Sequence, residues 1–321
     1  MPNTNTVIPN YQQLPVSPFD TIAQQNSIIL QNLRLGKVPT DKIAAAQELT
    51  VQSLPVRSDI VIPNHIHHAL GGSQSNEWCQ AAEAELQQLE KLGVWSAVKP
   101  VKGRKVIGAR WVFALKRNTS GAITRFKARY VARGFNQRPG QDFGNTYAPT
   151  ASLATLCLFL SISVQKVFVT HSFDVSSAYL YSPIDKEVYV KPPTKLHPEL
   201  KGKVLRLHKE LYGTKKAGRC WWLHFKNILA KLDFSASKVE SLLCVYKRDD
   251  ILIYIWMHVN NGLVVSNSPA ALDKLCRNLT QHLEIKWQEG IDQIVGLNVC
   301  HHPSGIHLEQ NLLTVSPQDI T

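Results

Sequence analysis

The spacing of apolar residues divides the chain into a polar N-terminal stretch and a patterned remainder. Residues 1–74 are rich in Asn, Gln, Pro, Ser and Thr, a composition that is typical of a flexible linker or tail. Further on, Trp78, Leu86 and Leu89 recur at helical spacing behind a serine cap, which indicates an amphipathic helix. The pattern therefore predicts a folded domain over residues 75–321.

Strand and helix patterns are mixed along this domain. Val167–Val175 has the apolar content of a buried strand, and a short helix or turn is expected from Ser176 to Tyr181. Amphipathic spacing predicts one helix over Ala217–Leu232 and another that begins near Ser268 and Pro269. Because the two kinds of element do not alternate regularly, we expect an α+β fold.

A basic segment stands out near the start of the domain. No Asp or Glu occurs between Lys91 and Gln141, whereas Lys, Arg and aromatic residues recur throughout. Arg110–Lys116 and Ile123–Ala132 have strand-like content, and residues 118–121 between them are turn formers. The segment predicts a basic β-hairpin that contacts phosphates and stacks on bases. The alternative is a basic face that is only solvated.

A second hairpin is predicted closer to the C-terminus. Two apolar runs, Ile251–Val259 and Leu263–Val265, flank the sequence Asn260-Asn261-Gly262. Asn-Gly between two strands favours a tight turn, because both residues tolerate a positive φ. Taken alone, this pattern indicates a β-hairpin and no chemistry.

Composition narrows the range of partners. The 321 residues carry a net charge of +12 and are 44% hydrophobic, which favours a folded protein with a polyanionic partner, DNA or RNA. A membrane span is not expected, because the longest apolar run, Ile251–Val259, is far below the required ~20 residues. Without a secretory signal pattern, we expect an intracellular location, cytoplasmic or nuclear. Six scattered cysteines without a C-x-x-C pair indicate reduced core residues.

Several blocks of sequence, in a fixed order, resemble a known family. Phe173–Leu180 contains the run Phe-Asp-Val-Ser-Ser-Ala-Tyr-Leu, and Leu211–Trp221 begins Leu-Tyr-Gly-Thr-Lys-Lys-Ala. The further blocks are Arg110–Phe113, Phe126–Phe135, Tyr147–Pro149 and Val188–Pro193. Over about residues 76–312 the chain is similar to the reverse transcriptase domain of copia-type LTR retrotransposon Pol polyproteins.

The resemblance implies a right-hand polymerase fold with a palm and with fingers over about residues 104–138. In this family two Mg²⁺ ions lie between one Asp on a central strand and two adjacent Asp at a hairpin tip. Asp174 matches the first, but Asn260 and Asn261 occupy the paired positions. At an effective dielectric of ~20, each lost charge removes an interaction worth several kcal/mol before desolvation. We therefore expect metal binding to be weak or lost and polymerisation to be strongly reduced or absent.

Other site residues follow from the same resemblance. Lys116 and Arg129 would contact the incoming deoxynucleoside triphosphate, and Tyr179 would exclude a ribose 2′-hydroxyl. His258 and Gly296 would lie on the primer side. The expected partners are an RNA template and a DNA primer or duplex. The alternatives are that the two cations are only solvated and that Tyr179 is a core aromatic residue.

The C-terminal segment and the activity complete the predictions. Ile294–Val299 and Gly305–Leu308 resemble a hairpin that grips the primer, and because the chain stops soon after it, we expect the thumb to be missing. Three hypotheses stay open: an inactive reverse transcriptase domain, a non-catalytic nucleic-acid-binding module that uses the basic fingers, and residual activity after deamidation at Asn261.

Overall fold

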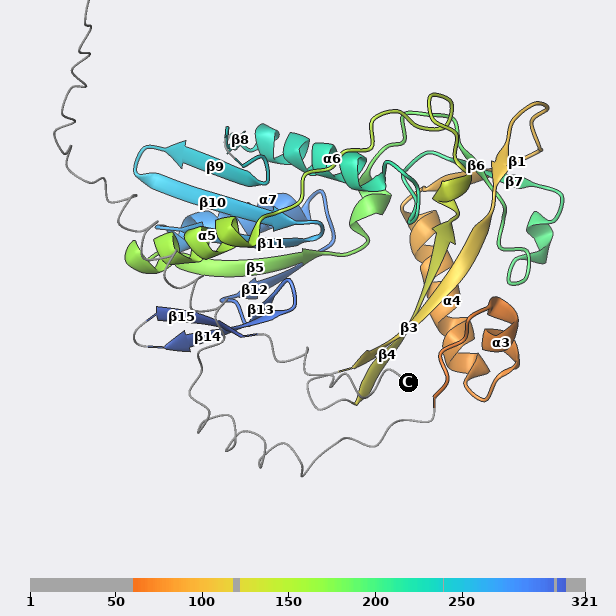
Figure 1. The fold of residues 1–321 in the computed structure, drawn as a ribbon, viewed down its shortest axis with the longest axis horizontal. Helices are drawn as coiled ribbons and strands as arrows, with labels where there is room; N and C mark the ends of the chain where they lie inside the picture. The colour runs from red at the N-terminus through yellow and green to blue at the C-terminus, as the bar shows by residue number, and fades with distance from the viewer. Residues whose placement is uncertain (1–59, 118–121, 239, 303–304, 310–321) are drawn as a thin grey trace, which may run out of the picture. The chain divides into compact units, whose positions relative to one another are not determined.

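The computed structural model describes residues 60–117, 122–238, 240–302 and 305–309. Most of the predicted linker and the predicted turn at residues 118–121 lie outside these ranges. The described part combines helices with four separate sheets (Figure 1), so the predicted α+β class is confirmed. None of its helices combines the length and hydrophobicity that crossing a bilayer requires.

The largest sheet, here called the palm sheet, has six strands in the order β12-β5-β11-β10-β9-β8. Its strands are β5 (Val169–Val175), β8 (Ser235–Ala236), β9 (Leu243–Arg248), β10 (Ile251–His258), β11 (Asn261–Ser266) and β12 (Ile285–Glu289). All neighbouring pairs are antiparallel. The first strand of this sheet along the chain, β5, lies between the two late strands β11 and β12, which brings Asp174 beside the predicted hairpin.

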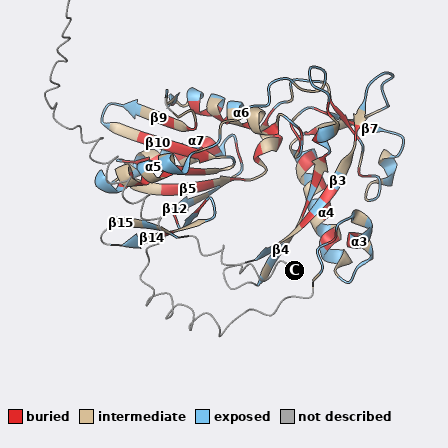
Figure 2. Ribbon diagram, viewed as in Figure 1, coloured by how far each residue is buried: buried red, intermediate tan, exposed pale blue. Residues whose placement is uncertain are grey.

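Helices cover both faces of the palm sheet, as the buried central strands in Figure 2 show. Alternate residues of a strand point to opposite faces. One face packs on α6 (Ala217–Lys231) and α7 (Pro269–Thr280). The other packs on α5 (Leu153–Gln165) and on residues from the sheet of β13 (Gln293–Ile294), β14 (Leu297–His302) and β15 (Gly305–Glu309).

The predicted helices begin and end close to where the periodicity placed them. Helix α6 carries a buried stripe, Trp221, Phe225 and Ile228. Helix α7 starts with Pro269 in its first turn, and the Ser268 hydroxyl accepts a hydrogen bond from the Ala271 amide at 3.3 Å. This cap satisfies one of the free amides at the helix start. Both predictions are confirmed.

The basic hairpin is also present. Strands β3 (Ala109–Arg117) and β4 (Ile123–Ala132) pair antiparallel, and α4 (Ser75–Lys91) packs against them. Trp78 on α4 meets the rings of Phe113 and Phe126 edge-on, with centroids 5.3 and 4.7 Å apart. One face of the hairpin is therefore apolar and covered, while its cations lie on the other.

A small four-stranded sheet contributes to the same hydrophobic core as hairpin β3–β4 and helix α4. Its order is β1 (Trp95–Val98), β7 (Val204–Leu207), β6 (Tyr189–Val190), β2 (Val106–Ile107). Among the described residues, short 3₁₀ turns occur at Gly134–Asn136, Ala178–Tyr181 and Pro198–Leu200. The second of these is the short helix or turn predicted after β5.

Helix α3 (Ile66–Gly71) lies inside the segment predicted to be linker. Its Ala69 is fully buried, and Ile66 packs on the same core as Trp78. The helix has only six residues, too few for a helical period to be visible among polar neighbours. The folded part therefore begins before residue 75.

The turn of the palm hairpin differs from its prediction. The last pair of the ladder is His258 with Asn261, so the two turn residues are Val259 and Asn260, and Asn261 and Gly262 already belong to β11. Val259 has a φ of 58°, a conformation that β-branched residues rarely adopt. Gly262 is required for a different reason than a turn: a Cβ at this position would collide with the Phe173 ring on β5.

We predict that Gly262→Ala destabilises the protein, because neither the Phe173 ring nor the paired backbone can move away. The expected loss is about 1–3 kcal/mol of unfolding free energy, measured by urea denaturation. Gly218→Ala is the matched control, since its Cβ would meet only the Ala148 Cβ at an ordinary 3.6 Å. It should be neutral or slightly stabilising in helix α6. Equal stability of the two variants would contradict the packing argument.

Candidate functional site

Four polar residues form a row across neighbouring strands of the palm sheet. His258 on β10 is paired with Asn261 on β11, Asn261 is paired with Asp174 on β5, and Asp174 is paired with Lys286 on β12. Residues directly opposite in antiparallel strands point to the same face, with Cβ atoms about 4.5–5.5 Å apart. The fold thus brings the predicted Asp174, Asn261 and His258 together and adds Lys286.

The second predicted Asn closes this row at the hairpin tip. The Asn260 amide nitrogen donates a hydrogen bond to Asp174 Oδ2 at 2.6 Å. An ionised carboxylate only accepts hydrogen bonds, so the NH₂ end of the amide must face it. The Asn260 carbonyl also accepts a hydrogen bond from the Val175 amide at 2.8 Å. Asn260 is therefore tied to β5 by both its side chain and its backbone.

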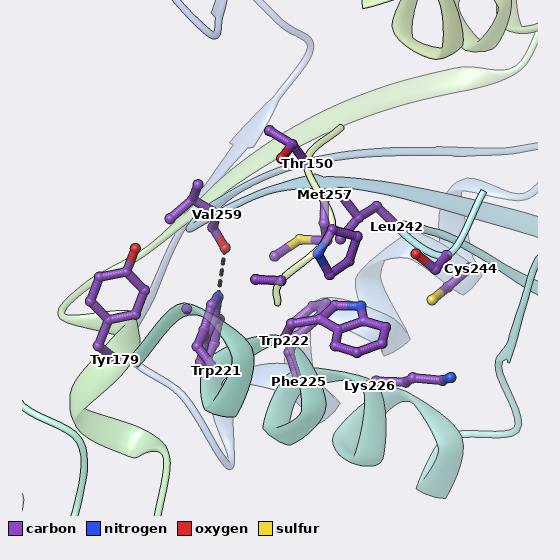
Figure 3. Close-up of a pocket in the computed structure, with 14 residues that line it drawn as sticks. Thr150, Tyr179, Trp221, Trp222, Phe225, Lys226, Leu242, Cys244, Met257 and Val259 are labelled. Carbon is purple, nitrogen blue, oxygen red and sulfur yellow. Dashed lines mark hydrogen bonds between the residues drawn. The ribbon is translucent and has the colours of Figure 1, made fainter. Parts of the chain in front are cut away.

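Helix α6 holds the other side of the hairpin tip. The Trp221 indole N–H donates a hydrogen bond to the Val259 carbonyl at 2.5 Å (Figure 3). This contact fixes Val259 in its unfavourable conformation, which surrounding structure must maintain. The tip lies between α6 and β5, so its geometry does not depend on a bound metal.

The residues present do not fit a two-magnesium site. Mg²⁺ is held mainly by anionic oxygens, and Asp174 is the one carboxylate in the row. Its Oδ2 already accepts the Asn260 N–H, and Lys286 is its cross-strand neighbour on the other side. Within the described residues, no group of three or more His, Cys, Asp or Glu could hold a metal ion. We therefore derive no metal-dependent step from this site.

Two of the predicted nucleotide contacts are linked through a residue that the sequence did not single out. The Arg129 guanidinium lies over the Tyr212 ring, 5.1 Å from its centroid, a favourable cation–π geometry. The Tyr212 ring in turn meets Tyr179 edge-on, with centroids 6.1 Å apart. Burial raises the pKa of Tyr212 to about 12, so its hydroxyl is neutral at physiological pH. The roles of Arg129 and Tyr179 in contacting a nucleotide stay predictions.

Hairpin β3–β4 is connected to Tyr212 by a close backbone contact. The Ala132 amide donates to the Tyr212 carbonyl at 2.8 Å. Gly213 follows with a φ of 83°, and a Cβ there would collide with the Ala132 carbonyl. The sequence Leu-Tyr-Gly was visible as a block, but only the structure shows that Tyr212 reaches Arg129.

The remaining predicted residues lie apart from the row. Lys116 is exposed near the end of β3, and its charge helps to lower the pKa of Lys127, after the larger effect of burial. Gly296 is exposed in the turn between β13 and β14, with a φ of 77°. By contrast, the two residues of β13, Gln293 and Ile294, line the same depression as Asp174.

One half-buried acid lies beneath the basic hairpin. Glu85 on α4 accepts a hydrogen bond from the Tyr130 amide at 3.2 Å. Burial raises the pKa of Glu85 to about 7, although the Tyr130 hydrogen bond and the nearby cations, Arg129 first among them, act in the opposite direction. The helix thus offers the hairpin a carboxyl group that titrates near neutral pH.

The sheet order, the hairpin beside Asp174 and the basic fingers define a polymerase-like domain. The sequence profile described as "Reverse transcriptase (RNA-dependent DNA polymerase)" matches residues 92–315. The chain therefore belongs to the reverse transcriptase family, and the predicted resemblance to copia-type elements is confirmed.

Similar proteins carry names of the same kind. The chain is 29% identical over 274 residues to the Retrovirus-related Pol polyprotein from transposon RE1 of Arabidopsis thaliana, covering 85% of this chain and 18% of that protein. It is 29% identical over 248 residues to the polyprotein from transposon TNT 1-94 of Nicotiana tabacum, covering 75% of this chain and 18% of that protein. The chain thus spans about a fifth of the length of these relatives.

A solved structure was also matched. It is the foamy viral protease-reverse transcriptase dRH in complex with ds DNA, which is 12% identical with a TM-score of 0.42. The match covers 70% of this chain and 35% of that one.

We predict that Asn260→Asp destabilises the protein at pH 7 in EDTA, because a second carboxylate would face Asp174 Oδ2. The expected loss is about 1–3 kcal/mol. Repulsion raises the pKa of one carboxyl in the folded state, so the deficit should shrink as the pH falls towards 4. Added Mg²⁺ should reduce it at pH 7. Asn227→Asp on the exposed face of α6 is the control, and a deficit insensitive to both pH and Mg²⁺ would contradict the argument.

We predict that Glu85→Gln changes stability in a pH-dependent way. A carboxyl whose pKa is raised in the folded state stabilises the fold below its unfolded pKa, and this contribution is lost as the pH rises to about 7. Gln still accepts the Tyr130 N–H and avoids the buried charge. As the pH rises from 4.5 to 8, the unfolding free energy of the variant should increase relative to that of wild type by up to about 3 kcal/mol. Denaturation curves of the exposed control Glu77→Gln should show no such trend.

Proposed function

We propose that the chain is a reverse transcriptase domain that retains the fold and the nucleic-acid contacts of its family but polymerises very slowly or not at all. The observation that carries this proposal is the hydrogen bond that the Asn260 side-chain amide donates to Asp174 Oδ2 at 2.6 Å. An amide donor stands where phosphoryl transfer with two metal ions needs an anionic oxygen. The proposed pseudoenzyme thus differs from an active enzyme in the charge at positions 260 and 261, while the geometry of the hairpin is retained.

The size of the effect follows from simple electrostatics. Replacing two aspartates by asparagines removes two of three negative charges, each worth about 8 kcal/mol with a divalent ion at 4 Å and an effective dielectric of ~20. Each ~1.4 kcal/mol corresponds to tenfold in affinity or rate. Even after desolvation cancels part of this, a loss of several orders of magnitude is expected.

The proposed partners are an RNA template and a DNA primer or duplex, which places the protein inside the cell, in the cytoplasm or nucleus. The net charge of +12 suits a polyanion. On the hairpin, Arg110, Lys116, Arg125 and Arg129 are all exposed. Arg129, held over Tyr212 next to Tyr179, would meet the triphosphate of a deoxynucleotide.

A second candidate is a module that binds nucleic acid without chemistry. Two observations favour it: the exposed cations of the hairpin, and the neighbours that Asp174 already has in Asn260 and Lys286. Such a module would bind primed template equally well with and without Mg²⁺. The two candidates differ in whether restoring the two aspartates restores incorporation, which is expected of the reverse transcriptase domain and not of a module that only binds.

The activity is tested by primer extension on an RNA template with Mg²⁺ or Mn²⁺. Wild type is compared with the double variant Asn260→Asp, Asn261→Asp. We expect incorporation to be far greater in the double variant than in wild type. Equal and measurable incorporation by the two proteins would refute the claim that the asparagines disable the site.

We predict that binding to primed template weakens steeply with salt. Each phosphate contact contributes a slope of about −0.7 to −0.9 in a plot of log K against log salt. Arg125→Met on the hairpin should reduce the magnitude of the slope by about 0.7–0.9, the contribution of one phosphate contact. Lys201→Met, exposed in a loop outside the hairpin, should leave it unchanged. Filter binding over a salt series measures this, and a slope near zero would show that the hairpin does not contact phosphates.

A further inference from the structure

An apolar cavity lies behind the tip of the palm hairpin, between helix α6 and strands β9 and β10 (Figure 3). Its volume is about 200 Å³. The wall is formed largely by Trp221, Trp222, Phe225, Leu242, Cys244 and Met257. Cys244 and Met257 belong to the sheet face that packs on α6, whereas Asp174, Asn261 and Lys286 point to the other face. The cavity therefore lies on the opposite face of the sheet from Asp174, although Tyr179, the predicted nucleotide contact, is part of its lining.

The size and lining of the cavity indicate the shape of a ligand. An apolar cavity of about 150 Å³ is sufficient to bind benzene, so about 200 Å³ accommodates one or two fused rings. The indoles of Trp221 and Trp222 and the ring of Phe225 offer aromatic surfaces, which favour a planar aromatic partner in stacked or edge-on geometry.

The charge at the wall indicates the polar group of that ligand. Lys226 is the one charged side chain of the lining, and its ammonium lies 5.4 Å from the centroid of the Trp222 ring. An anion attached to a buried ring would meet this ammonium. A nucleobase fits less well, because those of its several hydrogen-bonding edge atoms that meet the apolar part of the wall would lack partners.

We propose that this cavity binds a small planar aromatic carboxylate, with the rings against Trp221, Trp222 and Phe225 and the carboxylate facing Lys226. The proposal goes beyond the proposed polymerase-like function and does not depend on it. Val259, whose carbonyl is bonded to Trp221, and Met257 also line the cavity. A bound ligand therefore contacts the strand that leads to the hairpin tip.

The test uses naphthalene-2-carboxylate as the probe, titrated into the full chain by calorimetry. We expect saturable binding with a dissociation constant of about 0.1–1 mM, the range for a ligand of this size. The uncharged naphthalene-2-carboxamide should bind more weakly. Failure of the carboxylate to bind in this range would overturn the proposal, and tighter binding of adenosine monophosphate would show that the site takes nucleotides instead.

Two pairs of variants locate the probe. Gly218 lines the cavity from α6, so Gly218→Phe should fill it and weaken binding at least about tenfold, whereas Gly218→Ala should bind like wild type. Lys226→Met should weaken the carboxylate about two- to fivefold and leave the carboxamide unchanged, with the exposed Lys247→Met as control. Unweakened binding to a folded Gly218→Phe would overturn the location. If that variant does not fold, equal effects of Lys226→Met on both probes would overturn the assigned orientation.

Discussion

The pairing of β5 with β11 is the constraint on which the rest of the site depends. It sets Asp174 opposite Asn261 and Phe173 opposite Gly262, and the missing Cβ of Gly262 leaves the room that the Phe173 ring occupies. This close packing fixes the register, because a shift by one residue would turn every side chain to the other face. The hairpin tip is then held from both sides, by the hydrogen bonds of Asn260 to Asp174 and Val175 of β5 and by the hydrogen bond from Trp221 of α6. A site whose shape is determined by packing and backbone pairing can lose its charges and keep its geometry.

The basic hairpin is attached to the rest of the fold by equally specific contacts. Its apolar face is covered by α4, where Trp78 meets two phenylalanine rings. Its end is joined to Tyr212 by a backbone hydrogen bond, and Arg129 lies over the same tyrosine. The cations are thereby presented on a supported strand and not on a free loop, which favours defined phosphate contacts over a general electrostatic attraction.

The sequence predicted those parts of the fold whose patterns are long or local. The strands of both hairpins and helices α6 and α7 follow from periodicity, and Asp174 and the two asparagines follow from ordered blocks. The turn was predicted over Asn260-Asn261-Gly262, but only Asn260 of these lies in it, because the preference of Asn-Gly for tight turns was outweighed by pairing with β5. Lys286 was missed because β12 is short and rich in charged and polar residues, and Tyr212 because its importance arises only from tertiary contacts with Arg129 and Tyr179.

The central claim is that the hairpin retains its geometry while the charge needed for metal has been lost. Manganese binding, followed by the electron paramagnetic resonance signal of free Mn²⁺, tests this claim most directly. Wild type should leave the signal of equimolar Mn²⁺ almost unchanged, and the double variant Asn260→Asp, Asn261→Asp should reduce it markedly, because the carboxylates would stand where the amides now lie. Tight binding of Mn²⁺ by wild type at this site, or its absence in a folded double variant, would contradict the account.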